Sequence, residues 1–268
     1  YEYVKKFGLT EKTGIDLPGE SKGIMFDYDA FNELEQATVA FGQGISITPM
    51  QLVRAVCACV NGGTLYKPYL VDKIIDSYSN DIVYEHKPEA LRKVISEDAS
   101  KKMRDALESV VTDGGGKNAY IDGYRIGGKT GTAQKAVNGS YVDGGYILSF
   151  IGIAPIDDPK IVLYVAMDNP KNCVQYGGTT VAPIARKMLV DILPSMNVKK
   201  VSSQRQKAYT FMDTKTLKVE NYIGKSKKEV SNPELKFEFI GEGDKVIDQL
   251  PRVGESVEAG STIVVMLG

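Results

Sequence analysis

The chain contains few cysteines and almost no histidine, and this scarcity restricts the chemistry that it can carry. Of its 268 residues, three are Cys, one is His and none is Trp. Three cysteines cannot all pair within one chain, so we expect no framework of disulfides to hold the fold together. A single histidine leaves little room for a Ser-His-Asp triad or for a histidine-rich metal site.

The cysteines nevertheless leave one kind of metal site open. Cys57 and Cys59 lie two residues apart in a segment with a helical pattern, so their side chains point roughly 200° apart. We interpret both as small, buried apolar residues. One alternative is a structural zinc site that joins one of the two, with Cys57 as the candidate, to Cys173 or His86. The other alternative is a redox pair.

Neither an excess of basic residues nor a long apolar run is present. Lys and Arg number 33 and Asp and Glu 34, so the formal net charge is -1. Proteins that bind nucleic acid usually carry a basic excess, and we expect no nucleic-acid partner here. The longest apolar run, 161–167, has the length of a strand, whereas a bilayer span needs roughly 20 residues. The first residue is Tyr, and we expect the chain to be an internal piece of a longer protein.

Hydrophobic periodicity and turn residues predict a fold that mixes helices and strands. Apolar positions keep helical spacing behind capping residues in four segments, at 2–7, 48–61, 96–112 and 179–193. Strands are predicted at 69–78, 82–86, 124–126 with 129–137, 146–154 and 160–167. Because helices and strands do not alternate regularly, we predict an α+β fold with an antiparallel sheet flanked by helices.

A change in composition divides the chain. Residues 195–215 hold five basic residues against one acidic residue and lack helical periodicity, which is typical of a linker. Residues 216–268 are punctuated by glycines and predict a short helix at 226–232 and strands at 235–240, 245–250 and 262–267. We therefore predict a large unit over 1–194, a linker over 195–215 and a small α+β unit over 216–268.

The segment 123–132 carries the clearest chemical signal and has two interpretations. Its letters, GYRIGGKTGT, satisfy the phosphate-binding pattern G-x-x-x-x-G-K-T, which ends on Lys129 and Thr130. They also contain K-T-G-T, a strand motif of serine acyl-transfer enzymes.

The surrounding residues favour the strand. A phosphate-binding loop follows a buried strand and opens a helix whose amides hold the phosphates. Residues 113–122 are polar and rich in Gly, and residues 131–145 contain four glycines. A strand followed by a turn at 138–139 fits this composition better than a helix. The alternatives are a P-loop nucleotide-binding protein and a purely structural edge strand.

Each residue of K-T-G-T can contribute to the binding of a carboxylate. Lys129 brings a positive charge, and the hydroxyls of Thr130 and Thr132 can donate hydrogen bonds. Gly131 has no side chain, so a ligand can lie against the strand backbone. The amide of Thr132 would point at a developing oxyanion.

The sequence as a whole resembles the C-terminal part of a class B penicillin-binding protein, a D,D-transpeptidase of peptidoglycan synthesis. The likeness rests on GGKTGTAQ at 127–134, FG with TGIDLPGE between 7 and 20, GQG at 42–44, ITPMQL at 47–52, NGG at 61–63, SFIG at 149–152 and YGG at 176–178. Residues 216–268 resemble a PASTA module. One such module behind the transpeptidase resembles a sporulation-type member of the family.

The resemblance implies a serine acyl-enzyme that acts on D-Ala-D-Ala stem peptides, with β-lactams as mimics of the substrate and with no required cofactor. It implies that Lys129 and Thr132 act in catalysis and that Thr130, Gly131, Thr132 and Gln134 bind the substrate. It also implies a location at the extracytoplasmic face of the membrane, an anchoring N-terminal helix absent from this chain, and a glycosyltransferase partner in the membrane.

The nucleophile motif of that family is missing from the chain. The family's serine lies in S-x-x-K, and no Ser here is followed three residues later by Lys. The second motif, S-x-N, is matched by Ser195-Met196-Asn197, which lies after K-T-G-T and therefore in the wrong order. We interpret the chain as the substrate-binding part of a transpeptidase of spore cortex or septal wall synthesis. A non-catalytic module that binds cell wall through residues 216–268 is the alternative.

Overall fold

The computed structural model describes residues 1–137, 140–207 and 216–268. It divides into two compact units, Tyr1–Lys207 and Ala208–Gly268, and each is described by itself. The turn predicted at 138–139 and the second part of the predicted linker, 208–215, lie outside the described residues. No helix among the described residues is long and apolar enough to cross a membrane.

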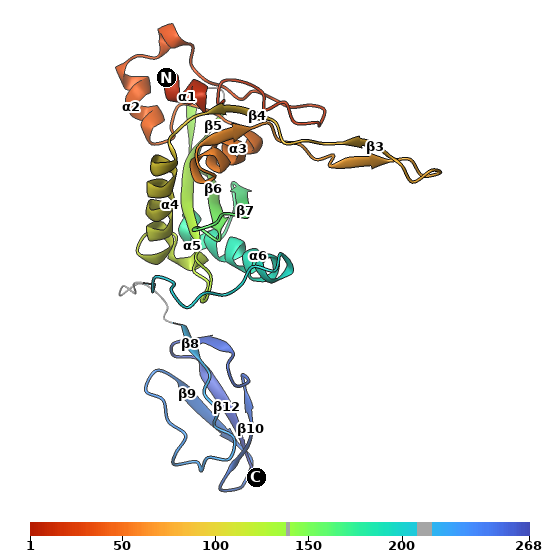
Figure 1. Cartoon of the computed structure of the whole chain (residues 1–268). Coiled ribbons are helices and arrows are strands. Elements are labelled where there is room, and N and C mark those ends of the chain that lie inside the picture. Colours follow the sequence, from red (N-terminus) through yellow and green to blue (C-terminus); the bar gives the residue numbers. More distant parts are fainter. Residues whose placement is uncertain (138–139, 208–215) are drawn as a thin grey trace. The chain divides into compact units, whose positions relative to one another are not determined.

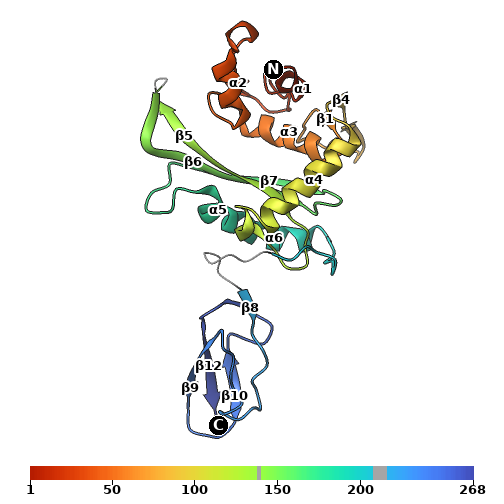
Figure 2. The ribbon, with the colours of Figure 1, turned by 90° about the vertical axis from the view of Figure 1, so that its left-hand side faces the viewer.

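A three-stranded antiparallel sheet forms the centre of the first unit (Figures 1 and 2). Its order is β5 (Gly127–Val137), β6 (Ser140–Ala154) and β7 (Ile161–Asp168). Helix α6 (Ala182–Ser195) covers one face, and α3 (Pro49–Val60) covers the other (Figure 2). Helix α4 (Glu97–Thr112) packs against β5. The predicted α+β architecture with helices around an antiparallel sheet is confirmed.

Alternation along β6 supplies both apolar layers. Leu148 and Phe150 are completely buried against Leu189 of α6, whereas Ile153 points to the opposite face and packs with Val60 of α3. Successive side chains of a strand point to opposite faces, so one strand can fill two cores. Each fully buried side chain of this size stabilises the fold by about 1.5–3 kcal/mol.

Helix α3 begins as predicted and positions the N-terminal segment. The Thr48 hydroxyl accepts a hydrogen bond from Gln51 N, and the Gln51 amide oxygen accepts one from Thr48 N, which together form a capping box. The buried Gln51 amide also donates to Glu11 O at 2.8 Å. The buried Arg54 guanidinium donates to Gly8 O at 2.7 Å. These contacts attach the segment that follows α1 (Glu2–Lys6) to α3.

The smaller elements of this unit lie around that framework. They are η1 (Tyr28–Ala30), α2 (Glu33–Ala40), β1 (Thr64–Tyr66), β2 (Lys73–Ile75), β3 (Ile82–Glu85), β4 (Ala90–Lys93), η2 (Lys117–Ala119) and α5 (Gly177–Thr180). Strand β1 pairs with β4, and β2 pairs with β3 in an antiparallel hairpin. The hairpin extends away from the rest of the first unit (Figure 1).

The helix predicted at 179–193 starts and ends elsewhere. It begins at Gly177 as the short α5, is interrupted at Val181, and continues as α6 beyond Pro194. Neither predicted threonine caps it, because Thr180 instead donates its hydroxyl to Val174 O at 2.5 Å. Pro194 lies inside the last turn of α6, and the helix ends one residue later, at Ser195.

The first part of the predicted linker, 195–207, is packed against the first unit. Val201 N donates to Gly123 O at 2.8 Å. The buried Gln204 amide oxygen accepts from Gly123 N at 2.7 Å, and its NH2 group donates to Ile121 O at 2.7 Å. These contacts use backbone groups and one amide, so a search for apolar periodicity does not detect them.

The second unit contains strands and turns from Thr216 to Gly268. Strand β8 (Thr216–Lys218) pairs with β11 (Ser256–Glu258). The sheet β10-β12-β9 is formed by β10 (Val246–Leu250), β12 (Thr262–Leu267) and β9 (Lys236–Ile240). Its core contains the completely buried Tyr222, Ile263 and Val265.

The prediction of a short helix at 226–232 is wrong. Ser226 forms a bridge with Lys245 instead, and turns follow it. The Glu229 carboxylate accepts from Ser226 N at 2.8 Å, which reproduces half of a capping box without a helix behind it. Pro233 disfavours a helical backbone at Asn232, which explains why the turn does not extend.

Candidate functional site

The K-T-G-T residues lie in the middle of β5. Lys129 is paired with Ile151 and Thr132 with Leu148 of β6, and the strand continues to Val137. Residues 123–137 are all described and contain no helix. Because a P-loop needs a helix directly after its Lys and Thr, this segment lacks the structural context for binding a nucleotide phosphate.

The sheet separates the predicted site residues onto two faces. Residues directly opposite in an antiparallel pair share a face, so Thr130, opposite Phe150, and Thr132, opposite Leu148, lie on the α6 face. Gln134 has the same parity and shares that face. Lys129 and Gly131 lie on the opposite face. The structure therefore brings the two hydroxyls and Gln134 together and places the lysine across the strand from them.

The threonine face meets the N-terminal end of α5. Gly177 N donates to Thr132 Oγ1 at 3.2 Å. A Cβ added to Gly115 would lie 2.5 Å from the Tyr176 hydroxyl and 4.0 Å from Thr130 Oγ1. The loop around Gly115, Tyr176 and the two threonines therefore converge on one spot. Asn118 donates to Gly178 O at 2.9 Å and holds this loop to α5.

Lys129 has an exposed side chain whose charge is free to meet a ligand. Its Nζ donates to Thr130 O at 2.8 Å, and it forms no ion pair with any residue in the described ranges. Lys135, six residues along the same strand, pairs with Asp168 at 2.6 Å. Lys129 therefore keeps an uncompensated positive charge close to the backbone of β5 at Thr130.

Strand β5 is an edge strand of the described sheet, because only β6 pairs with it. An edge strand offers unpaired N–H and C=O groups to an extended ligand. The lack of a side chain at Gly131 allows a ligand to come close to this backbone. The strand combines backbone hydrogen-bonding groups, two hydroxyls and one cation, which is a suitable set for an extended peptide with a carboxylate.

The zinc candidates are not assembled into a metal site. Cys57 lies on α3, His86 follows β3, and Cys173 lies in the loop between β7 and α5; each cysteine is free and half-buried. Across 1–137, 140–207 and 216–268, no group of three or more His, Cys, Asp and Glu side chains is placed to hold a metal ion. Burial raises the pKa of the Cys57 thiol and raises that of Cys59 to about 11. Both are half-buried where the sequence predicted buried residues, and their raised pKa values fit small thiols packed among apolar groups.

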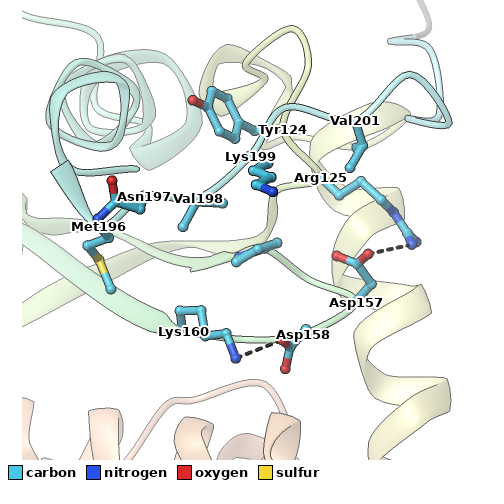
Figure 3. A pocket seen from close by; sticks show the side chains of 11 residues that line it. Tyr124, Arg125, Asp157, Asp158, Lys160, Met196, Asn197, Val198, Lys199 and Val201 are labelled. Carbon is cyan, nitrogen blue, oxygen red and sulfur yellow. Dashed lines mark ion pairs between the residues drawn. The ribbon is translucent and has the colours of Figure 1, made fainter. Parts of the chain in front are cut away.

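A pocket of about 430 Å³ lies at the end of the sheet where β5 begins (Figure 3). Tyr124, Met196 and Val198 contribute apolar surface, and two ion pairs lie at its rim, Arg125–Asp157 at 3.6 Å and Lys160–Asp158 at 2.7 Å. None of the predicted site residues lines it. The pocket and the K-T-G-T residues of β5 are therefore separate features.

Sequence reasoning did not assign a role to Gly115, Tyr176 or Gly177. Tyr176 and Gly177 precede or begin the short α5, and Gly115 lies in the loop after α4. The available signal was the pairing of two glycine clusters, 114–116 and 177–178, because clustered glycines often mark close backbone approach.

Comparisons with known proteins identify a family in which a K-T-G-T strand is expected. Residues 1–190 match the family model for the penicillin binding protein transpeptidase domain. The chain is 49% identical to stage V sporulation protein D of Bacillus subtilis, over 100% of the chain and 42% of that protein. It is 36% identical to peptidoglycan D,D-transpeptidase FtsI of Buchnera aphidicola, over 72% of the chain and 32% of that protein.

The structural comparison reaches the same family. Penicillin binding protein 3 of Mycobacterium tuberculosis, in complex with ampicillin, matches with a TM-score of 0.69 at 30% identity, over 76% of this chain and 47% of that chain. The chain therefore spans less than half the length of these relatives.

Proposed function

Because the chain belongs to the penicillin-binding protein transpeptidase family, we propose that the whole protein is a peptidoglycan D,D-transpeptidase and that this chain carries its substrate-binding strand. The observation that carries the proposal is K-T-G-T on an edge strand, with two threonine hydroxyls beside the N-terminal end of α5. The names of two relatives, D,D-transpeptidase and stage V sporulation protein D, support the activity and a role in sporulation.

The proposed reaction is acyl transfer through a serine ester. A serine outside this chain attacks the carbonyl between the two D-Ala residues of a stem peptide, which forms the ester and releases the terminal D-Ala. The amine of a neighbouring stem peptide then attacks the ester and forms the cross-link. Serine acyl transfer of this kind needs no metal ion.

The strand residues supply binding and charge stabilisation. Thr130 and Thr132 donate to the terminal carboxylate. The Lys129 ammonium, which contacts the Thr130 carbonyl, adds positive charge to the strand that this carboxylate approaches. The Thr132 amide supplies one donor to the oxyanion. Gln134 contacts the substrate further along the strand, and Gly131 allows it to approach the backbone.

β-Lactams bind as mimics of the D-Ala-D-Ala end, and a relative in complex with ampicillin supports this assignment. We further propose that residues 216–268 are a PASTA module and that the whole protein is anchored at the extracytoplasmic face of the membrane beside a glycosyltransferase. The resemblance of these residues to that module supports the first assignment, and the family supports the second.

The test is covalent labelling of the full-length protein with a fluorescent penicillin. Lys129→Ala should slow acylation by about 10²-fold, the effect of removing a preorganised charge from a reacting site. Lys135→Ala is the matched control, because it lies on the same strand and face and pairs with Asp168. Its acylation rate should equal that of the wild type.

Three further results bear on the proposal. Thr132→Val keeps the shape and strand preference of the side chain and should slow acylation by about tenfold, the value of one hydrogen bond to a charged group. The isolated chain 1–268 should not be labelled, because it contains no S-x-x-K motif. If the full-length protein is not acylated, or if Lys135→Ala slows it as much as Lys129→Ala, the proposal is wrong.

A further inference from the structure

The β2–β3 hairpin exposes apolar side chains on both of its faces. Every residue of the two strands is exposed, and Ile74, Ile82 and Val83 keep 52%, 56% and 67% of their surface accessible. Ile74 lies opposite Tyr84 and Ile75 opposite Ile82, across a shift in register between Ile74 and Ile75. Val83 lies on the face of β3 opposite to that of Ile82 and Tyr84. Figure 1 shows the hairpin extending away from the rest of the first unit, so no helix among the described residues of this unit covers either face.

The base of the hairpin is held in place by polar contacts. The Asp16 carboxylate accepts from Leu70 N at 2.8 Å and from Val71 N at 2.9 Å. These hydrogen bonds, from Val71 first, lower the pKa of the Asp16 carboxyl below its ordinary value. His86 stacks on Tyr69 with ring centroids 3.6 Å apart. The strands therefore leave the body of the unit at a defined position.

The tip is equally well defined. The Asp76 carboxylate accepts from Tyr78 N and Ser79 N, each at 2.9 Å. Asn80 adopts a positive φ of 62°, which asparagine tolerates better than most residues. Both ends of the hairpin are held by hydrogen bonds, while its middle presents apolar side chains that no described element of the first unit covers. An isolated two-stranded hairpin is at best marginally stable, and contiguous exposed apolar surface commonly marks an interaction site.

The charges of the hairpin indicate which kind of partner could cover it: a second copy of this chain, a lipid surface or another protein. Between Asp72 and Glu85 there are four acidic residues and one lysine. Two copies of this net-negative hairpin would repel each other, and so would the hairpin and an anionic lipid surface. Asp76 and Asp81 at the tip also oppose insertion into a membrane. Charge complementarity therefore favours a basic protein partner.

The two strands leave one edge each without a strand partner, since the described sheet contains β2 and β3 alone. Such edges accept an added strand, whose alternate side chains then contact the two faces. We propose that the β2–β3 hairpin is a docking arm for an extended segment of another protein, in which apolar side chains alternate with Lys or Arg. The hairpin does not include β5, so this inference does not rest on the transpeptidase activity.

The test measures binding of a fluorescent synthetic peptide, Lys-Val-Lys-Ile-Lys-Val-Lys-Ile, to the chain 1–268. Binding should be saturable, and replacement of every Lys of the peptide by Glu should abolish it. The double variant Ile82→Thr/Val83→Thr keeps strand preference while removing apolar surface, and it should weaken binding by at least about tenfold.

The matched control is Ile247→Thr in the second unit, which removes an equally exposed isoleucine, 61% accessible, from a strand. It should bind like the wild type. The single variant Val83→Thr, at the most exposed strand position, replaces the double variant if the latter does not fold. Amide hydrogen exchange should slow in residues 73–85 when the peptide is bound.

Several results would overturn the proposal. These are no saturable binding up to about 1 mM peptide, equal binding of the Glu peptide, and equal binding of the double variant. Self-association in sedimentation that the double variant abolishes would assign the arm to a second copy. Binding to anionic vesicles that it abolishes would assign the arm to lipid.

Discussion

At the residue scale, the site depends on glycines that allow backbones to approach. A Cβ on Gly177 would lie 2.5 Å from the carbonyl oxygens of both Gly131 and Ser149. These acceptors are backbone atoms of β5 and β6, which cannot move without shifting the sheet. By contrast, the atom nearest to a Cβ on Gly131 is the Ser149 hydroxyl, which can rotate away.

We therefore expect Gly177→Ala to destabilise the first unit by about 1–3 kcal/mol, the usual cost of overpacking. Gly131→Ala is the control and should cost less than about 1 kcal/mol, because only one hydroxyl has to rotate. Urea unfolding of the two variants and the wild type measures both values. Equal midpoints for the two variants would show that the close approach at Gly177 is relieved by other movements.

A second prediction concerns the thiol of Cys59. Burial raises its pKa from 9.0 to about 11, with a smaller contribution from Cys57. The neutral thiol is therefore the favoured form below pH 11, and at pH 8 only roughly one molecule in 10³ carries the reactive thiolate. Alkylation by iodoacetamide at pH 8 should be about 10²-fold slower than in urea-unfolded protein, and it should rise about tenfold per pH unit toward pH 11.

Tandem mass spectrometry after timed alkylation measures this rate and separates Cys59 from Cys57. If the folded and unfolded proteins react equally fast, Cys59 is accessible and its interpretation as a buried structural residue fails.

At the element scale, a buried ion pair joins α4 to the start of β5. The Arg125 guanidinium donates to both carboxylate oxygens of Glu108, at 2.8 and 2.6 Å. The Glu108 side chain is 2% exposed, so its charge depends on this partner. The contact fixes the direction from which β5 enters the sheet, and it thereby positions K-T-G-T.

We expect Arg125→Met to destabilise the first unit by about 3–5 kcal/mol, because it leaves a buried carboxylate without a partner. Glu108→Gln/Arg125→Met should recover most of that loss, since the buried charge is removed as well. Lys160→Met breaks the exposed pair with Asp158 and should cost at most about 1 kcal/mol. The midpoints of urea unfolding measure these losses of stability. Equal losses for Arg125→Met and Lys160→Met would contradict the argument from burial.

Prediction from sequence succeeded for elements whose ends carry local signals. The helices α3 and α4 begin behind Thr48 and Ser96, whose side chains cap them as expected. It failed at 226–232, where Ser226 N donates to the Glu229 carboxylate as in half of a capping box, without a helix behind it. It also failed to separate α5 from α6, because the start of α5 is determined by its contact with Thr132 on a distant strand.

At the scale of the whole molecule, each unit has its own buried core. The first is centred on residues such as Leu189 and Phe150, and the second on Tyr222, Ile263 and Val265. Because the two cores share no residues, a mutation in one core should change the stability of that unit alone.

Calorimetry should therefore resolve two transitions. Leu189→Ala should lower one of them and Ile263→Ala the other, each by the equivalent of about 2–5 kcal/mol, because both side chains are completely buried. A single transition that both variants lower by the same amount would show that the two units unfold as one.

The sequence by itself determined the helices α3 and α4 and the central strands, that K-T-G-T belongs to a strand, and which family the chain resembles. These conclusions depend on periodicity, caps and glycines that lie within a few residues of one another. Only the tertiary structure decided that Lys129 lies across the strand from Thr130 and Thr132, and that residues 195–207 pack against the first unit. It also decided that Gly177 meets β5 and that the β2–β3 hairpin is uncovered. These arrangements depend on contacts between residues far apart in the chain, which local patterns do not encode.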